Sequence, residues 1–180
     1  MQLTKTGYYA DFVVYPSLVL ALGWAGLRHA PLIERWEWLF ACAAGVIVWS
    51  LFEYFLHRHV LHRLQPFKRM HDLHHAHSTD LIGTPTWLSL CGFGGFALIL
   101  WYEIEAVLAS GLTVGLMLGY LWYVAVHHAV HHVKVQRGSW LHRAKLRHAM
   151  HHHSQQPCNF GVTTALWDIA FGSTRQSVQD

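Results

Sequence analysis

Long stretches without charged residues constrain the fold of this chain more than any other feature of its sequence. Four stretches contain no Asp, Glu, Lys or Arg, and they cover residues 12–27, 38–52, 81–102 and 106–133. A helix needs roughly 20 mostly apolar residues, within a range of about 17–25, to cross the hydrocarbon core of a bilayer. The last two stretches reach that length, and the first two reach it when they extend past a flanking charge.

We therefore predict an all-α integral membrane protein, folded as a single domain over residues 1–180. Its four transmembrane helices are expected near residues 10–28, 36–56, 86–104 and 106–128. Charged residues make up only 13% of the chain, whereas a soluble domain carries about 25%. The alternative, a soluble bundle that buries the first two helices, would need polar outer faces on most helices. The formal net charge of +3 is too small to indicate a nucleic-acid partner.

Basic residues orient membrane proteins, because Lys and Arg are enriched in loops on the cytoplasmic side. The segments after the second and fourth predicted spans hold nine of the 13 Lys and Arg residues. We therefore expect both segments, and with them both termini, on the cytoplasmic side. Sixteen of the 17 histidines lie in these segments, at 57–77 and 127–153. An even number of crossings separates the two segments, so they emerge on one face of the membrane and can meet there.

The histidines fall into groups with regular spacing. The groups are His57 and His62 (H-x4-H), His71, His74 and His75 (H-x2-H-H), His127 and His131 (H-x3-H), and His148, His151 and His152 (H-x2-H-H). A helix turns about 100° per residue, so each H-x2-H-H group presents three imidazoles on one face within a turn. His57 and His62 lie about 140° apart on an ideal helix, which requires a helix end, a bulge or two different metals. His128 and His132 repeat the third group shifted by one residue, which leaves its register open.

Ten imidazoles in this pattern predict a site for two metal ions. Imidazole binds zinc, copper, iron and nickel, and one structural zinc needs only four ligands. Close two-metal sites are usually catalytic. A site at the membrane surface suits a substrate with an aliphatic tail, and hydroxylation of its C–H bonds needs an oxidant such as iron with dioxygen. A His-rich metal transporter is the more remote alternative, because it would need polar residues or histidines along the spans.

The histidine groups and the closing segment 160–173 resemble the membrane-bound fatty acid hydroxylase superfamily, which includes fatty acid 2-hydroxylases and sterol desaturases. The resemblance covers roughly residues 53–174. It implies a non-haem di-iron oxygenase that inserts OH into a fatty acyl or related lipid chain, with two Fe ions and dioxygen as co-substrate. Zinc can occupy such a site in a purified sample, since imidazole accepts either metal. The metal ligands that the resemblance implies are His57, His62, His71, His74, His75, His127, His131, His148, His151 and His152.

The substrate and the reaction stay open within this resemblance. The eight residues between His62 and His71 are closer to the sterol-type members, whereas the gap between His57 and His62 is closer to the acyl 2-hydroxylases. Desaturation, or hydroxylation of a sterol or a carotenoid, is therefore the alternative. Eukaryotic acyl 2-hydroxylases often carry a fused haem domain, and we expect none in this chain. We thus expect a separate electron-donor protein, a b-type cytochrome or a ferredoxin.

Two carboxylates are candidates for orienting the metal ligands. Metal-bound histidine usually donates its other ring N–H to a carboxylate or a carbonyl. Glu53 precedes His57 by one helical turn and is the first candidate, with an interfacial pairing to Arg58 as the alternative. Asp168 is the second candidate; it can also bond to backbone or cap the Trp167–Phe171 turn. The predicted metal-binding cap comprises residues 57–80 and 127–175.

Overall fold

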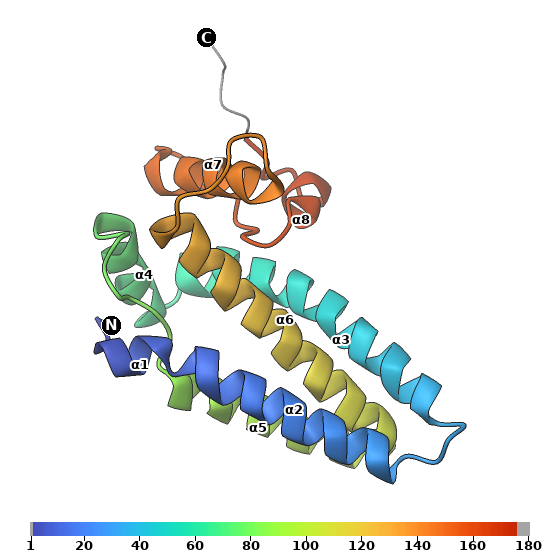
Figure 1. The fold of residues 1–180 in the computed structure, drawn as a ribbon. Coiled ribbons are helices and arrows are strands. Elements are labelled where there is room, and N and C mark those ends of the chain that lie inside the picture. The colour runs from blue at the N-terminus through green and yellow to red at the C-terminus, as the bar shows by residue number, and fades with distance from the viewer. Residues whose placement is uncertain (1, 176–180) are drawn as a thin grey trace. The chain divides into compact units, whose positions relative to one another are not determined.

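The computed structural model describes residues 2–175, and every regular element in that range is a helix (Figure 1). The helices are α1 (Lys5–Tyr9), α2 (Asp11–His29), α3 (Arg35–Phe55), η1 (Leu56–Leu61), α4 (Phe67–Ala76), α5 (Thr86–Glu103), α6 (Ala106–His132), α7 (Trp140–His153) and α8 (Leu166–Ala170). This chain thus has the predicted all-α fold. It forms two compact units, and helices α3 and α6 contribute to both. Unit 1 comprises the residues up to Trp49 with Gly83–Leu121, and unit 2 comprises Ser50–Ile82 with the residues from Trp122 onward.

Three helical stretches of the described chain are long and apolar enough to cross a bilayer, namely Lys5–His29, Arg35–Leu61 and Ala106–His132. They correspond to the first, second and fourth predicted spans. The third predicted span forms α5, which has 18 residues and is not among the three. At 1.5 Å per residue α5 is about 27 Å long, slightly shorter than a hydrocarbon core of about 30 Å. A crossing by α5 therefore stays a prediction.

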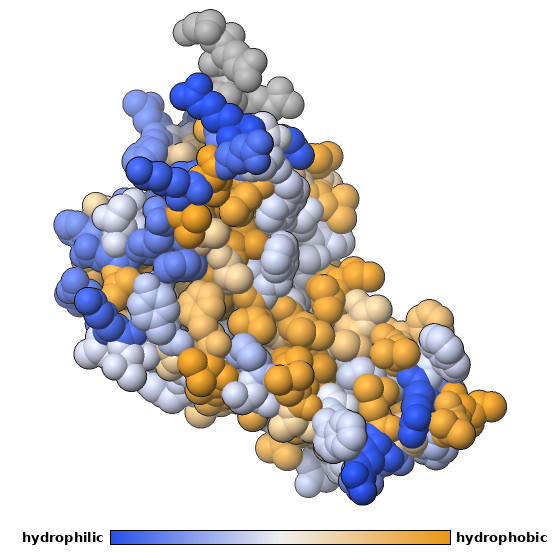
Figure 2. All heavy atoms as spheres, in the orientation of Figure 1, coloured by the Kyte–Doolittle hydropathy of each residue, from blue (hydrophilic) through white to orange (hydrophobic). Residues whose placement is uncertain are grey.

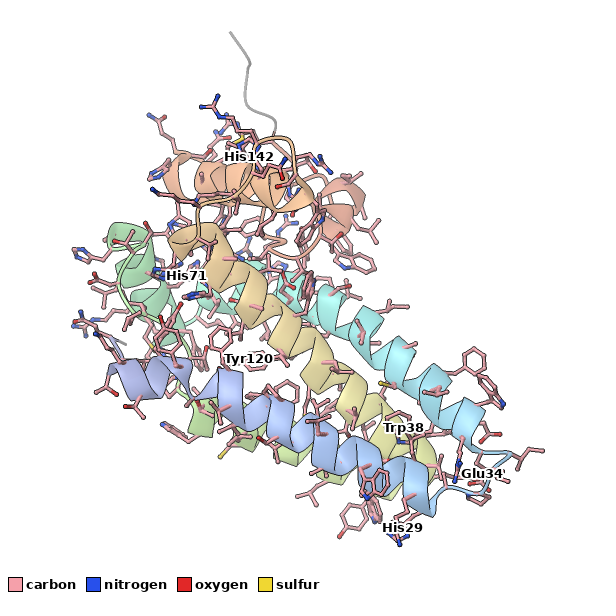
Figure 3. The ribbon with its side chains drawn as sticks, in the orientation of Figure 1. His29, Glu34, Trp38, His71, Tyr120 and His142 are labelled. Atoms are coloured by element: carbon pink, nitrogen blue, oxygen red, sulfur yellow. The ribbon has the colours of Figure 1, made fainter. Side chains whose placement is uncertain are left out.

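Unit 1 is held together by a buried polar cluster that joins α2, α5 and α6. The carboxylate of Asp11 accepts hydrogen bonds from Tyr120 Oη at 2.5 Å and from Thr86 Oγ1 at 2.6 Å. Figure 3 shows Tyr120 pointing from α6 toward α2. Nearby, Tyr15 Oη donates to Ser89 Oγ at 2.8 Å. Because these groups satisfy one another, an ionisable residue is accommodated between apolar helices.

Helices α3 and α6 approach closely within unit 1 because glycines lie at their contact. A Cβ atom on Gly115 would lie 2.0 Å from the carbonyl oxygen of Cys42. One on Gly45 would lie 2.4 Å from the carbonyl oxygen of Leu112. Neither distance is compatible with a side chain, so the crossing requires glycine at both positions. Small residues at such contacts are typical of helix packing in membranes.

The outside of unit 1 carries many exposed large apolar side chains, as expected of helices surrounded by lipid. Examples are Leu20, Trp24, Phe40, Ile47 and Leu98. Figure 2 shows such apolar side chains over much of the surface that faces the viewer.

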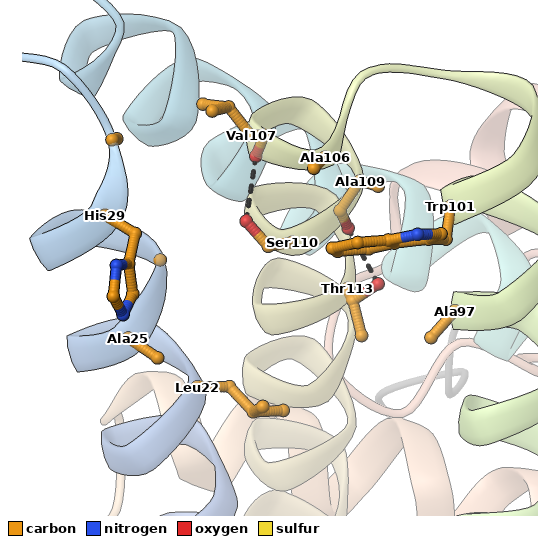
Figure 4. Close-up of a pocket in the computed structure, with 12 residues that line it drawn as sticks. Leu22, Ala25, His29, Ala97, Trp101, Ala106, Val107, Ala109, Ser110 and Thr113 are labelled. Atoms are coloured by element: carbon orange, nitrogen blue, oxygen red, sulfur yellow. Dashed lines mark hydrogen bonds between the residues drawn. The ribbon is translucent and has the colours of Figure 1, made fainter.

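A cavity of about 480 Å³ also lies in unit 1, between α2, α5 and α6 (Figure 4). Its wall is mostly apolar, and the hydroxyls of Ser110 and Thr113 bond to carbonyl oxygens of their own helix.

Candidate metal centre

The two histidine-rich segments meet in unit 2, where η1, α4, α6 and α7 each contribute imidazoles. Two groups of histidines have ring nitrogens that all lie within 4.8 Å of one another and can hold a metal ion. The first group is His57, His62, His71, His75 and His151, and the second is His74, His131, His148 and His152. His127 adjoins the second group, with its Nε2 3.1 Å from Nε2 of His74. All ten imidazoles singled out in the sequence are thus brought together.

A π-helical turn places His57 and His62 on the same face. The N–H of His62 donates to the carbonyl oxygen of His57 at 3.3 Å, which is the i to i+5 pattern of a π-helix. The Nε2 atoms of both rings then lie 3.0 and 3.1 Å from Nε2 of His71, which α4 presents (Figure 3). The 140° separation expected on an ideal helix is therefore removed by a bulge, one of the three solutions that the spacing allowed.

Each H-x2-H-H motif contributes imidazoles to both groups rather than to one. On α4, His71 and His75 face the first group while His74 faces the second. On α7, His151 faces the first group while His148 and His152 face the second. The rings of His75 and His152 stack with centroids 4.2 Å apart, so the two groups adjoin.

The structure distinguishes between the two possible registers of the third histidine group, 127/131 and 128/132, because only one pair of rings faces the remaining histidines. Nε2 of His131 lies 2.8 Å from Nε2 of His148, and the ring of His127 lies 4.8 Å from that of His74. In contrast, the rings of His128 and His132 stack on each other with centroids 4.7 Å apart. The structure therefore directs the 127/131 pair, rather than the 128/132 pair, toward the other histidines of the two groups.

Burial keeps these imidazoles neutral. Desolvation, reinforced by repulsion from His75, lowers the pKa of His62 to about 4. Desolvation, with repulsion from His131, lowers the pKa of His74 to about 3. The pKa of His151 falls to about 3, mainly through desolvation, although a hydrogen bond to a carbonyl opposes the shift. A neutral imidazole has one nitrogen lone pair to offer a metal ion, so low pKa values favour metal binding over protonation.

Two hydrogen bonds decide which nitrogen carries the lone pair in the first group. Nδ1 of His57 lies 2.6 Å from the carbonyl oxygen of Phe160, and Nδ1 of His151 lies 2.7 Å from that of Cys158. A carbonyl oxygen only accepts, so Nδ1 donates and Nε2 of each neutral ring keeps its lone pair. The Nε2 atoms of both rings point among other Nε2 atoms at 3.0–3.1 Å. Converging lone pairs repel one another without a cation between them, so this group fits a metal ion.

Glu53 fixes the segment that supplies these carbonyl oxygens. Its Oε1 accepts from the backbone N–H groups of Val162 and Thr163 at 2.8 and 3.0 Å. Its Oε2 accepts from Thr163 Oγ1 at 2.6 Å. The structure thus assigns this buried carboxylate to backbone N–H groups and a hydroxyl, rather than to an imidazole or to Arg58.

Asp168 holds the same segment from its other side. Its Oδ1 accepts from the N–H of Phe160 at 2.8 Å, and its Oδ2 accepts from the N–H of Gly161 at 2.7 Å. A Cβ on Gly161 would lie 2.1 Å from the carbonyl oxygen of Thr164, so only glycine fits here. Asp168 therefore bonds to backbone, one of the alternatives that the sequence left open.

The family comparison agrees with this geometry. The family model described as fatty acid hydroxylase matches residues 42–173, which contain every histidine of both groups. The chain belongs to the fatty acid hydroxylase family. This finding confirms the resemblance that the motifs indicated over roughly residues 53–174.

Relatives of this fatty acid hydroxylase family member occur in animals, plants and fungi. Fatty acid 2-hydroxylase of Macaca fascicularis is 30% identical over 197 residues, which cover 94% of this chain and 53% of that protein. Dihydroceramide fatty acyl 2-hydroxylase FAH1 of Arabidopsis thaliana is 33% identical over 143 residues, covering 72% and 58%. Ceramide very long chain fatty acid hydroxylase SCS7 of Saccharomyces cerevisiae is 32% identical over 192 residues, covering 95% and 46%. The chain thus spans about half the length of the curated relatives it matches.

A solved structure shares the fold of this family member. It is described as full-length scs7p with only the hydroxylase domain visible, and it superposes with a TM-score of 0.83 at 24% identity. The match covers 96% of this chain and 68% of that one.

Two features of the site were not predicted from the sequence. One is the pair of carbonyl groups, from Cys158 and Phe160, that face ring nitrogens. The resemblance of segment 160–173 to the family's closing segment was the available signal, although it said nothing of backbone atoms. The other is Tyr123, whose ring stacks on that of His127 with centroids 5.5 Å apart and an interplanar angle of 7°. Its position four residues before His127 was the signal, because that spacing places both on one helix face.

Proposed function

We propose that this chain is a dioxygen-dependent di-iron hydroxylase that inserts OH into a C–H bond of a fatty acyl chain. The observation that carries the proposal is the convergence of two neighbouring groups of neutral imidazoles in a member of this family. Several relatives are named fatty acid 2-hydroxylases, which supports carbon 2 of the acyl chain as the position attacked. The substrate is then a fatty acid or a ceramide-type lipid, as in the relatives' names.

In this proposal each histidine group holds one iron ion. His57, His62, His71, His75 and His151 bind the first ion, and His74, His127, His131, His148 and His152 bind the second. Bound iron supplies the activation of dioxygen that protein side chains lack. The chain itself supplies lone pairs at fixed positions, and burial keeps protons off them. Carbonyl groups behind His57 and His151 hold those rings in the productive tautomer.

The reaction needs an external source of electrons. Hydroxylation consumes one dioxygen molecule, two electrons and two protons; one oxygen atom enters the C–H bond and the other leaves as water. We propose that a separate protein, a b-type cytochrome or a ferredoxin, delivers the electrons.

We also propose that α2, α3, α5 and α6 cross the membrane within a single hydroxylase domain, and that the histidine groups lie on the cytoplasmic side. Support comes from the three apolar stretches that are long enough to span. Nine of the 13 Lys and Arg residues lie in segments 57–77 and 127–153, which supports the orientation.

Product analysis tests the proposal. The protein is purified in detergent, its iron is counted, and it is given a reductant, a fatty acid or ceramide and ¹⁸O-labelled dioxygen. We expect about two iron ions per chain and a 2-hydroxy product that contains ¹⁸O. A double bond without added oxygen would instead identify a desaturase, and a lack of bound transition metal would refute the metal centre.

A further inference from the structure

We propose that the two metal positions are unequal, and that the first group binds its ion more tightly because segment 158–163 orients two of its imidazoles. The inference builds on the metal centre of the proposed function and adds an order of filling to it. It rests on the hydrogen-bond partners of the imidazole Nδ1 atoms, and not on which imidazoles form each group.

The first group is braced through a segment that buried hydrogen bonds hold in place. The carbonyl oxygens of Phe160 and Cys158 accept from Nδ1 of His57 and His151. This segment is in turn held by Glu53 from α3 and by Asp168 from α8, whose side chains are 3% and 1% exposed. The two rings are therefore fixed in tautomer and in orientation before any metal binds.

The second group lacks this bracing for three of its rings. Among the described residues, no protein group forms a hydrogen bond with the buried Nδ1 of His74, His148 or His152. No protein group then selects the tautomer that presents the Nε2 lone pair, and each ring can rotate about its side-chain bonds at lower cost. Metal binding must fix these rings itself, which weakens the net affinity.

The expected ratio of the two metal dissociation constants can be taken from other proteins in which a hydrogen-bond partner of a metal-binding histidine was removed. Removing a group that holds a ligating histidine typically costs about 10–100-fold in metal affinity. The first group has two such partners, so we expect its dissociation constant to be at least about tenfold lower. On this argument Glu53 and Asp168 are positioning residues, because they act on the metal site only through the backbone of segment 158–163.

Titration of the metal-free protein with cobalt(II) tests the inference, since visible absorption reports imidazole coordination directly. We expect two resolved binding steps, each of about one ion per chain. His71→Ala should remove the tight step, and His148→Ala should remove the weak one. One step of two equivalent ions, or the reverse assignment, would overturn the inference but leave the proposed function standing. Failure to bind cobalt or iron at all would contradict the proposed function instead.

The bracing itself is tested with Asp168→Asn. Asparagine can accept from one N–H of the segment, but its amide N–H₂ opposes the other. We expect the tight step to weaken by about 10–100-fold while the weak step is unchanged. Equal weakening of both steps would indicate general unfolding and would overturn the assigned role.

Asp72→Asn is the matched control, because Asp72 is an exposed carboxylate of unit 2 that pairs with Lys68 at 2.5 Å. It removes the same charge near the first group without touching segment 158–163, so it should change the tight step by less than about fivefold. A comparable loss in both variants would show that charge, not bracing, controls affinity.

If Asp168→Asn does not fold, Thr163→Val removes only the hydroxyl bond to Glu53 and should weaken the tight step in the same direction.

Discussion

At the scale of single residues, the candidate centre in unit 2 depends on the protonation state and the tautomer of its imidazoles. Its imidazoles are held neutral by burial, and two of them have their Nδ1 protons assigned by carbonyl oxygens. The buried carboxylates nearby, Glu53 and Asp168, bond to backbone N–H groups of the segment that carries those carbonyls. Both candidate groups are thus made of imidazoles alone, without a carboxylate.

Alanine at His74 tests the ligand assignment. Nε2 of His74 is directed at the second group, so its loss removes one ligand from one ion only. We expect bound metal to fall from about two to about one per chain, and hydroxylation to be lost. Elemental analysis and product assay measure these effects.

His77→Ala is the control, because His77 is exposed at the end of the same helix and outside both groups. Unchanged product formation in His74→Ala would show that the assignment is wrong.

Alanine at Gly161 tests the tight segment behind the first group. The added Cβ would lie 2.1 Å from the carbonyl oxygen of Thr164 and 2.9 Å from Asp168 Oδ2, so the backbone must move. Overpacking of this kind costs about 1–3 kcal/mol, which thermal unfolding in detergent detects as a lower Tm.

Gly94→Ala in α5 is the comparison, since a Cβ there meets nothing within 4 Å. That change should be neutral or stabilising, by up to about 1 kcal/mol. Equal Tm values for the two variants would contradict the close contact at Gly161.

At the scale of elements, helices from distant parts of the sequence bring together imidazoles that no single helix could gather. The π-helical turn η1 brings His57 and His62 onto one face, and α4 and α7 each divide three imidazoles between the two groups. Turns of this type are often found at functional sites, because they re-aim side chains within an otherwise regular helix. The centre therefore depends on the packing of four separate elements.

Low pH should reduce the free energy of unfolding of the metal-free protein. The pKa of His74 and of His151 is lowered to about 3 by burial, whereas an unfolded chain has a histidine pKa of about 6.5. Between those values the unfolded state binds more protons, so stability rises with pH and is lost as pH falls below about 6.5. Each group contributes up to about 1.4 kcal/mol per pH unit.

Thermal unfolding of metal-free protein from pH 8 to pH 4 measures this effect. We expect Tm to be level above about pH 7 and to fall steadily below about pH 6.5. Bound metal should delay the fall, because protons must then compete with the ion for the same nitrogens. A Tm independent of pH in the metal-free protein would contradict the neutral, buried state of these rings.

At the scale of the whole molecule, two units share the helices α3 and α6, and the family match covers parts of both. Unit 1 combines glycine contacts, a buried Asp11 cluster and an apolar exterior, all of which suit a lipid environment. Unit 2 holds the imidazoles. The glycine contacts and the Asp11 cluster therefore lie in unit 1 and the imidazoles in unit 2, while the apolar stretches Arg35–Leu61 and Ala106–His132 run through both units.

Thiol labelling tests whether α5 crosses the membrane. Glu105→Cys and Gln65→Cys introduce exposed thiols, one after α5 and one after α3. With four crossings they lie on opposite sides, so a membrane-impermeant reagent should label Glu105→Cys from outside and Gln65→Cys only after the membrane is opened. The native cysteines Cys42, Cys91 and Cys158 are replaced by serine beforehand. Labelling of both positions from the same side would show that α5 does not cross.

Features that depend on local geometry could be predicted from the order of residues alone. Apolar length predicted the helices at three stretches that can span a bilayer, and 3.6 residues per turn predicted that His71, His74 and His75 share one face. Spacing also limited His57 and His62 to a few solutions, although it did not choose the π-helical turn. These properties follow from the chain within one or two turns of each residue, so they can be read without the fold.

Which rings belong to the same group depends on how the helices pack. His71 joins His151 in the first group, and His74 joins His148 in the second, across 80 and 74 residues of sequence respectively. The same holds for Glu53, which reaches Thr163 and so supports a site that it does not contact. Such pairings depend on how separate helices pack against each other, and many packings are compatible with the same local periodicity.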